Sequence, residues 1–363
     1  MSALGETIKA LIAREGPIPL ERFMSIALTD AERGYYQVRD PLGAEGDFTT
    51  APEISQMFGE LVGLWAAEVW GVMDKPNPVR LVELGPGRGT LMSDALRAAR
   101  VTPEFRAALD VWLVETSPAL AETQRDMLLT CGAAVSWAPD LASVPDGPAI
   151  VIGNEFLDAL PVRQYVRGRS DWRERVVALD AKGNFAFAAA GAPERGIRAF
   201  APEGAILEVN PSAHRFVFEL ASRLAKQGGA ALFFDYGYAA TNFGETLQAL
   251  RSHRMVDPLS APGECDLTAH VDFAAMARSA SAAGAAIYGP VDQGDFLKAI
   301  GVMQRCEALV ARAQPGQRAE LESGRDRLVG KGQGEMGALF KAMVVANRAM
   351  PAPPGFLKNG PRP

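Results

Sequence analysis

Apolar residues with helical spacing mark the N-terminal part of the chain. This spacing appears over residues 4–14 and 20–28, and a longer apolar segment runs from about residue 54 to 72. Each segment has the amphipathic or apolar character of a helix that packs on a core. We therefore expect a helical N-terminal region over residues 1–75, and we expect it to close one side of a cofactor cleft.

Short apolar runs alternate with amphipathic segments from residue 79 onward. The runs predict strands and the amphipathic segments predict helices, because the two hydrophobic periods differ. Predicted strands cover 79–84, 111–115, 133–137 and 149–153, and predicted helices cover 90–99 and 118–129. Such alternation indicates a parallel sheet with a ligand site at the carboxyl ends of its strands. The sequence therefore predicts an α/β fold.

The alternation changes after residue 161. A hairpin-like pattern over 162–208 predicts an inserted β-ribbon. Farther along, we expect a helix over 212–225, a strand over 230–234, a long loop to about 270, a helix over 271–283, a strand over 285–288 and a helical insertion over 292–330. Residues 339–346 fit a last strand or a helix, and the proline-rich segment 351–363 is expected to be disordered. The main α/β domain is thus expected over 76–350.

The first predicted strand leads into a glycine-rich turn. Glu83 is followed by Gly85, Gly87 and Gly89 at alternate positions, with Pro86 among them. Glycine lacks a Cβ atom, so such a turn can take positive φ angles and let a ligand approach the backbone. The order Glu-x-Gly-x-Gly-x-Gly resembles motif I of the class I methyltransferases, which bind S-adenosylmethionine (SAM), and differs from the dinucleotide fingerprint. A tight turn without a ligand is the alternative.

Acids also follow the next two predicted strands. Glu115 ends the second strand, where a carboxylate can accept hydrogen bonds from both ribose hydroxyls. Asp140 follows the third strand, where it can reach an adenine amino group, although its surroundings also have the composition of an ordinary turn. We expect Glu115 and Asp140 to bind the cofactor, and we expect Glu83 to bind the amino group of its methionine portion.

A partly polar octet follows the fourth predicted strand. Asn154, Glu155 and Asp158 lie in a mostly apolar stretch that ends at Pro161. Burying carboxylates without partners costs desolvation free energy, so we expect these side chains to face a cleft. The alternative is an acidic helix N-terminus that Asn154 or Asp158 caps.

A short polar segment precedes the long N-terminal helix. Thr50 and Glu53 have the spacing of a capping box for that helix. The box does not account for Asp47, Phe48 and Thr49, which fit either the wall of a binding pocket or an ordinary loop.

The composition narrows the possible functions. The chain has 363 residues, of which 48% are hydrophobic and 22% charged, as in ordinary globular proteins. Its three cysteines show no CxxC spacing and its three histidines form no local cluster, so we expect no metal site. His270 fits a core histidine better than a catalytic base. The net charge of −6, without long lysine or arginine runs, argues against general nucleic-acid binding.

The N-terminal residues indicate a location. They include an early acid, and they lack both the apolar core of a signal peptide and the arginine-rich pattern of a transit peptide. No apolar stretch approaches the length of a membrane span. We therefore expect a cytoplasmic protein that does not insert into membranes.

Several motifs occur together and in order along nearly the whole chain. They are Gly46–Glu53, Glu83–Leu91, Asn154–Pro161, Asp235–Gly237, Gly263–Phe273 and Glu335–Met343. With these motifs, the chain resembles the MidA family of SAM-dependent methyltransferases, which includes a mitochondrial assembly factor for respiratory complex I. The resemblance covers roughly residues 5–350, and without a transit pattern we expect a bacterial member.

The resemblance implies a class I methyltransferase fold, Rossmann-like with a seven-stranded sheet, and SAM as the cofactor. It also implies methyl transfer to an arginine of a complex I subunit. Because a guanidinium is protonated at neutral pH, carboxylates must orient it. The residues expected at this site are Glu155, Asp158 and Asp235 as catalytic groups, Asp47, Phe48, Thr49, Thr50, Asp266 and His270 as substrate-binding groups, and Asn154 in the cofactor site.

Part of this assignment stays open. Glu155 resembles the first of two glutamates in the general arginine methyltransferases, whereas Gln164 stands at the place of the second. Asp158, Asp235 or Asp266 would then supply the other carboxylate. A small-molecule N- or O-methyltransferase would share every cofactor residue, and an assembly chaperone could bind SAM without turnover.

Overall fold

The computed structural model describes residues 2–38 and 49–356 of the chain. This part of the chain forms two compact units. The small unit comprises residues 2–38, 158–215 and 240–270, and the large unit comprises residues 49–157, 216–239 and 271–356. Each unit is therefore assembled from segments that lie far apart in the sequence.

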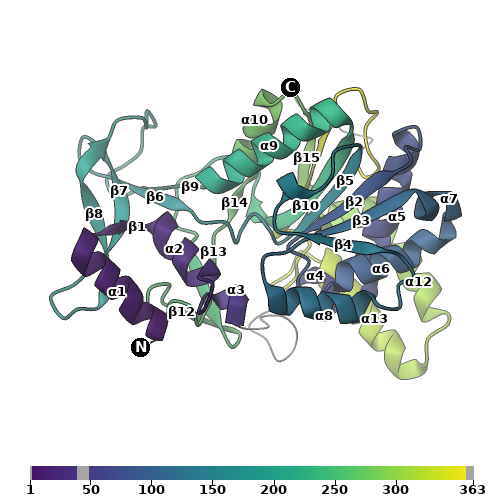
Figure 1. Cartoon of the computed structure of the whole chain (residues 1–363), viewed down its shortest axis with the longest axis horizontal. Coiled ribbons are helices and arrows are strands. Elements are labelled where there is room, and N and C mark those ends of the chain that lie inside the picture. Colours follow the sequence, from purple (N-terminus) through teal and green to yellow (C-terminus); the bar gives the residue numbers. More distant parts are fainter. Residues whose placement is uncertain (1, 39–48, 357–363) are drawn as a thin grey trace. The chain divides into compact units, whose positions relative to one another are not determined.

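A mostly parallel sheet forms the centre of the large unit (Figure 1). Its strands lie in the order β15–β16–β10–β5–β2–β3–β4, and the short β14 (Val271–Asp272) also pairs with β10. The strands are β2 (Val79–Leu84), β3 (Leu109–Val114), β4 (Val135–Ala138), β5 (Ala149–Asn154), β10 (Gly229–Tyr238), β15 (Ala286–Asp292) and β16 (Phe340–Ala346). β16 runs antiparallel to both of its neighbours. The predicted α/β fold is confirmed, and the ambiguous segment 339–346 is a strand.

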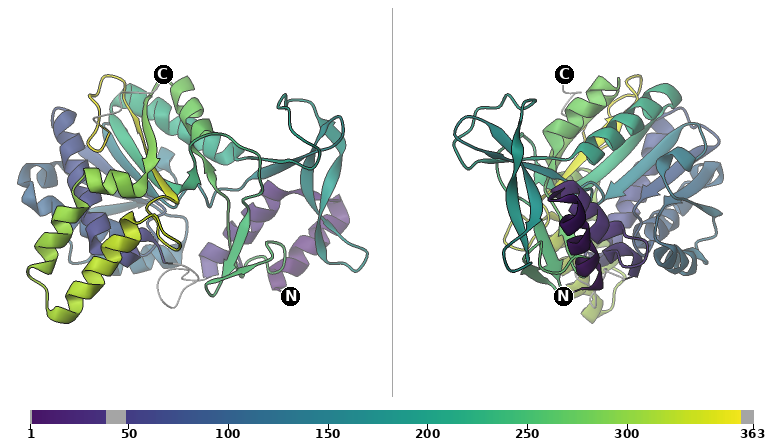
Figure 2. Two further views of the ribbon diagram at one scale, coloured as in Figure 1. Left: turned by 180° about the vertical axis from the view of Figure 1, so that it is seen from behind. Right: turned by 60° about the vertical axis from the view of Figure 1, so that its left-hand side comes forward.

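The helices of the large unit agree with the sequence periodicity over most of their length. They are α4 (Ala51–Ile54), α5 (Gln56–Val72), α6 (Thr90–Ala98), α7 (Pro103–Ala108), α8 (Pro118–Leu128), the greater part of α9 (Pro211–Gln227), α10 (Phe273–Ala282), α11 (Gln293–Ala299), α12 (Val302–Val310) and α13 (Pro315–Val329). Two 3₁₀ turns, η1 (Ala99–Val101) and η2 (Leu141–Ser143), complete the set. The segment 292–330, which we expected as a helical insertion, contains α11–α13, and α12 and α13 pack against each other (Figure 2).

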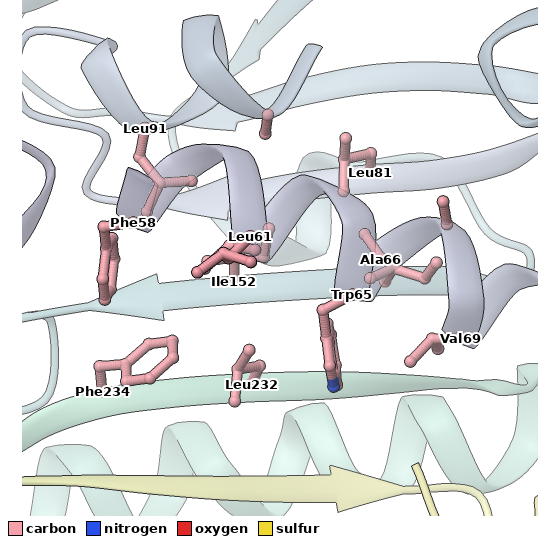
Figure 3. Packing of buried hydrophobic residues seen from close by; sticks show 14 of the residues in the cluster. Phe58, Leu61, Trp65, Ala66, Val69, Leu81, Leu91, Ile152, Leu232 and Phe234 are labelled. Carbon is pink, nitrogen blue, oxygen red and sulfur yellow. The ribbon is translucent and has the colours of Figure 1, made fainter. Parts of the chain in front are cut away.

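The core of the large unit lies between α5 and the sheet. Figure 3 shows Phe58 and Trp65 of α5 facing Leu232 and Phe234 of β10. The rings of Phe58 and Phe234 meet edge to face, with their centroids 4.9 Å apart. All four side chains are almost completely buried, and burial of such side chains contributes roughly 1.5–3 kcal/mol each. The long apolar helix therefore anchors the sheet.

Two glycines let α5 approach α6 closely. A Cβ atom on Gly63 would lie 2.6 Å from Cα of Ala95, and one on Gly59 would lie 2.7 Å from Cβ of Asp94. Real side chains do not tolerate such distances, so only glycine fits at these positions without a shift of the backbone. The close approach holds α6, which carries the glycine-rich turn at its start, against the core.

The start of α5 differs from the predicted capping box. Ser55 has an extended backbone and caps α5 by accepting a hydrogen bond from the Met57 N–H. Thr50 precedes the separate short helix α4 and makes no side-chain capping bond there. The carboxylate of Glu53 instead accepts a hydrogen bond from the Thr90 hydroxyl at 2.5 Å. The predicted single helix from residue 54 with a Thr50–Glu53 box is therefore wrong, because Ser55 interrupts it.

The small unit contains two antiparallel sheets and three helices in the described residues. Its helices are α1 (Ala3–Glu15), α2 (Leu20–Thr29) and α3 (Tyr35–Val38). One sheet holds β1 (Ile18–Pro19), β6 (Arg163–Arg167), β7 (Trp172–Leu179), β8 (Phe185–Glu194) and β9 (Ile206–Val209), and the other holds β11 (Gln248–Arg251), β12 (Arg254–Val256) and β13 (Asp266–Thr268). The segment 162–208, which we expected as an inserted β-ribbon, contains the strands β6–β9, and the N-terminal helices α1 and α2 pack on β7.

The expected long loop before residue 270 is wrong, because it contains the β11–β13 sheet. These strands are only three or four residues long, which leaves too few positions for a visible alternation. The buried side chains of Ala249 and Leu267 join those of α1 and α2 in one apolar cluster. The N-terminal helices are therefore divided between the units, with α1–α3 in the small unit and α4 and α5 in the large one.

The segment after β16 is ordered as far as residue 356. The indole N–H of Trp65 donates to the carbonyl of Pro354 at 3.2 Å, and Phe356 is buried with its ring centroid 5.3 Å from that of Phe296. Apolar packing therefore outweighs the proline-rich composition over residues 351–356, where we expected disorder, and residues 357–363 lie outside the described residues. In the two described ranges, no helix has both the length and the apolar character that a membrane crossing requires.

Candidate functional site

The parallel strands bring the predicted cofactor residues to one edge of the sheet. Leu84 of β2 lies opposite Val114 of β3 and Gly153 of β5, and Val114 lies opposite Ala138 of β4. The residues that follow these positions are the predicted ones: the glycine-rich turn after β2, Glu115 after β3, Asp140 two residues beyond β4, and Asn154 and Glu155 at the end of β5. The carboxyl edge of the sheet therefore collects polar groups from four strands.

The glycine-rich turn has the backbone that the sequence predicted. Gly85, Gly87 and Gly89 have φ angles of +58°, +53° and +84°, in the left-handed region that favours glycine. Gly85 is exposed, and a Cβ atom there would lie 3.4 Å from the ring of Phe156. Pro86 is buried, and α6 starts directly after Gly89. The turn thus presents bare backbone and the N-terminus of a helix at the carboxyl edge of the sheet.

Glu83 is a buried acid next to this turn. Its side chain is 3% exposed, and its Oε2 atom is buried without a hydrogen-bond partner in the described part of the chain. Desolvation raises the pKa of this carboxyl to about 8, nearby Glu115 raises it further, and the backbone N–H of Met92 opposes the shift. A cationic ligand group beside Oε2 would relieve this desolvation.

Glu115 is held from two sides. Its Oε1 atom accepts a hydrogen bond from the Ser117 N–H at 2.7 Å, and its Oε2 atom accepts one from the side-chain amide of Gln124 at 2.9 Å. Burial raises the pKa of Glu115, and both of these donors oppose the shift because they stabilise the charged form. The carboxylate is therefore oriented before any ligand arrives.

Gln124 is a site residue that the sequence reasoning missed. It is completely buried in α8, where it also donates to the carbonyl of Gly87 at 2.8 Å. The signal for it was present, since Gln124 lies on the apolar face of α8 with Leu120, Ala121 and Leu128. A lone amide on an apolar helix face needs polar partners in the core.

Asp140 is exposed and caps the turn η2. Its Oδ1 atom accepts hydrogen bonds from the backbone N–H and the hydroxyl of Ser143, both at 2.8 Å. These bonds lower the pKa of Asp140. Ordinary turn chemistry therefore accounts for one oxygen of this carboxylate, and its contact with adenine stays a prediction.

The loop after β5 has a constrained backbone. Glu155 takes a φ angle of +52°, which is unusual for a residue with a side chain, and its N–H donates to the carbonyl of Phe234 at 2.8 Å. The amide of Asn154 donates to Oε1 of Glu155 at 3.1 Å, while Oδ1 of Asn154 is buried without a partner in the ranges described. Strained backbone of this kind collects at functional sites.

Asp235 supports this loop from β10. It is completely buried, and its Oδ2 atom accepts a hydrogen bond from the Leu157 N–H at 3.0 Å. Gly237, two residues later, allows β10 to pair with β14, because a Cβ atom there would lie 2.2 Å from the carbonyl of Val271. The structure therefore brings Asp235 to the loop that carries Glu155.

Three predicted acceptor residues, Asp158, Asp266 and His270, lie in the small unit. The hydroxyl of Tyr36 donates to Oδ1 of Asp266 at 2.7 Å, and Asp158 and Asp266 are both buried. Burial raises the pKa of Tyr36 well above its ordinary value, and the charges of Asp266 and Asp158 add to the shift. His270 is half-buried, its backbone N–H donates to the Thr246 hydroxyl at 2.8 Å, and burial lowers the pKa of its imidazole.

The remaining predicted residues lie on the N-terminal side of α4. Asp47 and Phe48 are outside the described residues. Thr49 and Thr50 belong to the large unit, and Thr50 is 8% exposed at the start of α4.

Gln164, at the place of the second glutamate, donates to Glu208 at 2.7 Å within the β6–β9 sheet. Among the described residues, no group of three or more His, Cys, Asp or Glu side chains is arranged to hold a metal ion.

The chain is similar to methyltransferases along most of its length. Residues 61–291 match the model of a family described as S-adenosyl-L-methionine-dependent methyltransferases. The human protein named "Protein arginine methyltransferase NDUFAF7, mitochondrial" is 37% identical over 345 residues, which cover 88% of this chain and 78% of the human one. The zebrafish (Danio rerio) protein of that name is 36% identical over 367 residues, which cover 93% of this chain and 85% of the relative.

A solved structure supports the same conclusion for the fold. A crystal structure of a protein from Burkholderia thailandensis, bound to S-adenosyl-homocysteine, superposes with a TM-score of 0.85 at 29% sequence identity. The match covers 99% of this chain and 95% of the other. The class I methyltransferase fold and the cofactor that we expected are therefore confirmed. The expected cytoplasmic location is wrong, because the similar proteins are named as mitochondrial.

Proposed function

We propose, from the premise that this chain belongs to the family of S-adenosyl-L-methionine-dependent methyltransferases, that it transfers methyl groups to an arginine side chain of a protein. The observation that carries the proposal is the 36–37% identity to proteins named as arginine methyltransferases over most of both chains. The matched region covers 88–93% of this chain and so extends beyond the cofactor segments, which favours a common acceptor.

The residues at the carboxyl edge fit the cofactor. When bound, SAM supplies an electrophilic methyl group. The buried Oε2 of Glu83 and Oδ1 of Asn154 have no hydrogen-bond partner among the described residues, and both are acceptors that suit the amino group of a methionine portion. The backbone of Gly85, Gly87 and Gly89 allows a close approach. In the proposal, Glu115 holds the ribose and Asp140 the adenine.

An arginine acceptor requires carboxylates in a fixed geometry. A guanidinium is protonated at neutral pH, and carboxylates orient it through bidentate charge-assisted bonds. Glu155 suits this task because Asn154 holds one of its oxygens and the loop backbone is fixed by bonds to Phe234 and Asp235. Preorganised charge of this kind favours a transition state without reorganisation at the moment of reaction. Asp158, Asp235 or Asp266 is proposed to supply the second carboxylate.

We further propose that the acceptor protein is a subunit of respiratory complex I and that methylation occurs during its assembly. The support is the resemblance of six motifs, Gly46–Glu53 to Glu335–Met343, to the family that includes a complex I assembly factor. The acidic balance of the chain, with a net charge of −6, suits an arginine-bearing partner.

A methylation assay tests both parts. The purified chain is incubated with radiolabelled SAM and with complex I from cells that lack this protein, and labelled peptides are sequenced by mass spectrometry. We expect label on an arginine of a complex I subunit. Glu155→Gln should keep the affinity for S-adenosyl-homocysteine and reduce transfer by about a hundredfold or more.

Each other outcome points to a different function. Label that appears only on added small-molecule amines or hydroxyls would replace the protein acceptor by a small one. Tight binding to a complex I subunit that survives Glu155→Gln, without label in the wild type, would identify a chaperone instead of an enzyme.

A further inference from the structure

We propose that Gln124 is a positioning residue that orients Glu115 toward the ribose of the cofactor and couples it to the glycine-rich turn. The proposal rests on the proposed binding of SAM at the carboxyl edge of the sheet. It assigns a role to a side chain of α8, a helix in which the motifs predicted no site residue.

The orientation of the Gln124 amide is determined by its partners. Its Oε1 atom accepts a hydrogen bond from the indole N–H of Trp137 at 2.9 Å. An indole N–H can only donate, so the oxygen must face Trp137 and the NH₂ group must face the other way. That NH₂ group donates to Oε2 of Glu115 at 2.9 Å and to the carbonyl of Gly87 at 2.8 Å. Both N–H groups of the amide and one lone pair of its oxygen are thus assigned.

The donors on Glu115 leave room for a ribose hydroxyl. An ionised carboxylate offers about four lone-pair sites, two on each oxygen. The Ser117 N–H occupies one site on Oε1, and Gln124 occupies one on Oε2. Since the Thr116 N–H also donates to this carboxylate, about one of its four sites remains for a ribose hydroxyl. Without Gln124, Oε2 would lose the bond that fixes the rotation of the carboxylate.

The same amide connects the ribose acid to the glycine-rich turn. The carbonyl of Gly87 belongs to the turn, and a Cβ atom on Gly89 would lie 3.5 Å from Cγ of Gln124. Trp137, the third partner, is itself held by the guanidinium of Arg125, which lies 4.8 Å from the centroid of its ring. α8, β4 and the turn therefore set the position of Glu115 together.

Packing alone does not explain the glutamine. Gln124 is completely buried on a face that otherwise carries Leu120, Ala121 and Leu128. Leucine or methionine would fill a similar volume there without an amide that needs partners. The amide of Gln124 makes three hydrogen bonds, to Gly87, Glu115 and Trp137. Orientation of the site therefore explains a glutamine at this position better than packing does.

Ligand discrimination tests the role. The purified full chain is titrated by calorimetry with S-adenosyl-homocysteine and with its analogue that carries 2′-deoxyribose. We expect the wild type to prefer the ribose form by about tenfold or more, the scale of a hydrogen bond to a charged group. In Gln124→Met, we expect the affinity for the ribose form to fall by about tenfold and the preference to fall to about threefold or less. An unchanged preference in this variant would overturn the proposal.

A matched control separates positioning from general destabilisation. Gln293 is also completely buried, in α11, where its amide donates to the carbonyl of Leu328 at 3.1 Å. Gln293→Met should lower the unfolding temperature and leave the ribose preference at the wild-type value. If it reduces the preference as much as Gln124→Met does, the effect is structural and the positioning role is refuted.

A second variant keeps the test valid if Gln124→Met does not fold. Gln124→Glu keeps the shape and the acceptor for Trp137, but it turns an oxygen toward Glu115 and Gly87. We expect it to lose the preference at pH 8 and to recover part of it near pH 5, where a protonated carboxyl can donate one bond again. Preference that is independent of pH would contradict the proposal. Failure of the wild type to bind S-adenosyl-homocysteine at all would instead refute the proposed function.

Discussion

Replacement of Glu83 by glutamine should make the protein more stable at alkaline pH and less able to bind its cofactor. Glu83 is 3% exposed, and its Oε2 atom has no hydrogen-bond partner in the described ranges. Glutamine has the same shape as a protonated glutamate but cannot ionise. The substitution therefore removes the charge and leaves the packing of β2 nearly unchanged.

The size of the effect follows from the pKa of this carboxyl. Burial raises the pKa from the ordinary value of 4.5 to about 8. Between these values, the folded protein holds a proton that the unfolded chain has lost, so stability falls as the pH rises, by about 1.4 kcal/mol per unit. The penalty is absent below pH 4.5 and complete above pH 8, where it amounts to about 5 kcal/mol. Glu83→Gln abolishes this slope.

Urea unfolding at pH 5, 6, 7 and 8, without cofactor, measures the pH dependence of the unfolding free energy. The wild type is compared with the Glu83→Gln variant. Tryptophan fluorescence reports mainly on the large unit, which contains Trp65, Trp70, Trp112 and Trp137. The other titrating groups are common to both proteins, so the difference in unfolding free energy isolates Glu83. We expect this difference to grow by about 3–4 kcal/mol in favour of the variant from pH 5 to pH 8. The exposed residue Glu122, changed to glutamine, serves as the control with a flat difference.

Cofactor binding should show the opposite preference. In the proposed site, the ammonium of S-adenosyl-homocysteine pairs with ionised Glu83, so binding between pH 6 and 7.5 must release the proton that this carboxyl holds. Calorimetry in two buffers with different ionisation enthalpies should detect a release of nearly one proton, and affinity should rise by up to about tenfold per pH unit. Glu83→Gln should bind weakly and release none. A pH-independent stability difference, or equal proton release by both proteins, would refute the reasoning.

Three further substitutions have defined outcomes. Gly63→Ala should lower the unfolding free energy in urea by about 1–3 kcal/mol, because its Cβ atom would lie 2.6 Å from the backbone of α6. Gly71→Ala, on the same helix but with open space around it, is the control and should not destabilise the protein. Glu155→Gly should raise the stability by about 1 kcal/mol in thermal unfolding, because it relieves a φ angle of +52°, and should abolish methyl transfer. Arg305→Met should lower the unfolding free energy by about 1–2 kcal/mol, because buried Glu60 loses a bidentate partner with bonds of 2.7 and 2.9 Å but keeps its ion pair with Arg97.

The sequence carried most of the information about the sheet edge. Strand β2 was predicted with its observed bounds, because an apolar run of its kind, followed by alternate glycines, leaves little choice of structure. Once parallel strands were predicted, the carboxyl edge followed, and with it the placement of Glu83, Glu115 and Glu155 near one another in the sheet. The spacing of hydrophobic residues, and the rule that parallel strands place ligand sites at their carboxyl ends, were sufficient to predict this edge.

Contacts between distant segments were beyond the same reasoning. The Thr90 hydroxyl binds Glu53, which the local pattern assigned to a capping box, because a tertiary partner competed successfully with the local one. Gln124 gave no motif, since its role depends on β4 and on the turn after β2. The pairing of Tyr36 with Asp266 likewise joins residues that are 230 positions apart. Such partners are fixed by the fold, and a single sequence does not reveal them.

The energetics of the carboxyl edge connect stability with cofactor binding. Glu83 and Asn154 each bury an oxygen that has no partner within residues 2–38 and 49–356, and Glu155 has a strained backbone. Each of these residues therefore makes the unliganded protein less stable than an apolar or glycine substitute would. The buried helix α5, with Phe58 and Trp65 on the sheet, supplies the apolar burial that offsets them. A ligand present at a hundred times its dissociation constant adds about 2.7 kcal/mol to the folded state. Near neutral pH, this contribution offsets much of the loss of folding free energy that burial of Glu83 causes. Cofactor binding therefore restores stability that the residues of the site had lost.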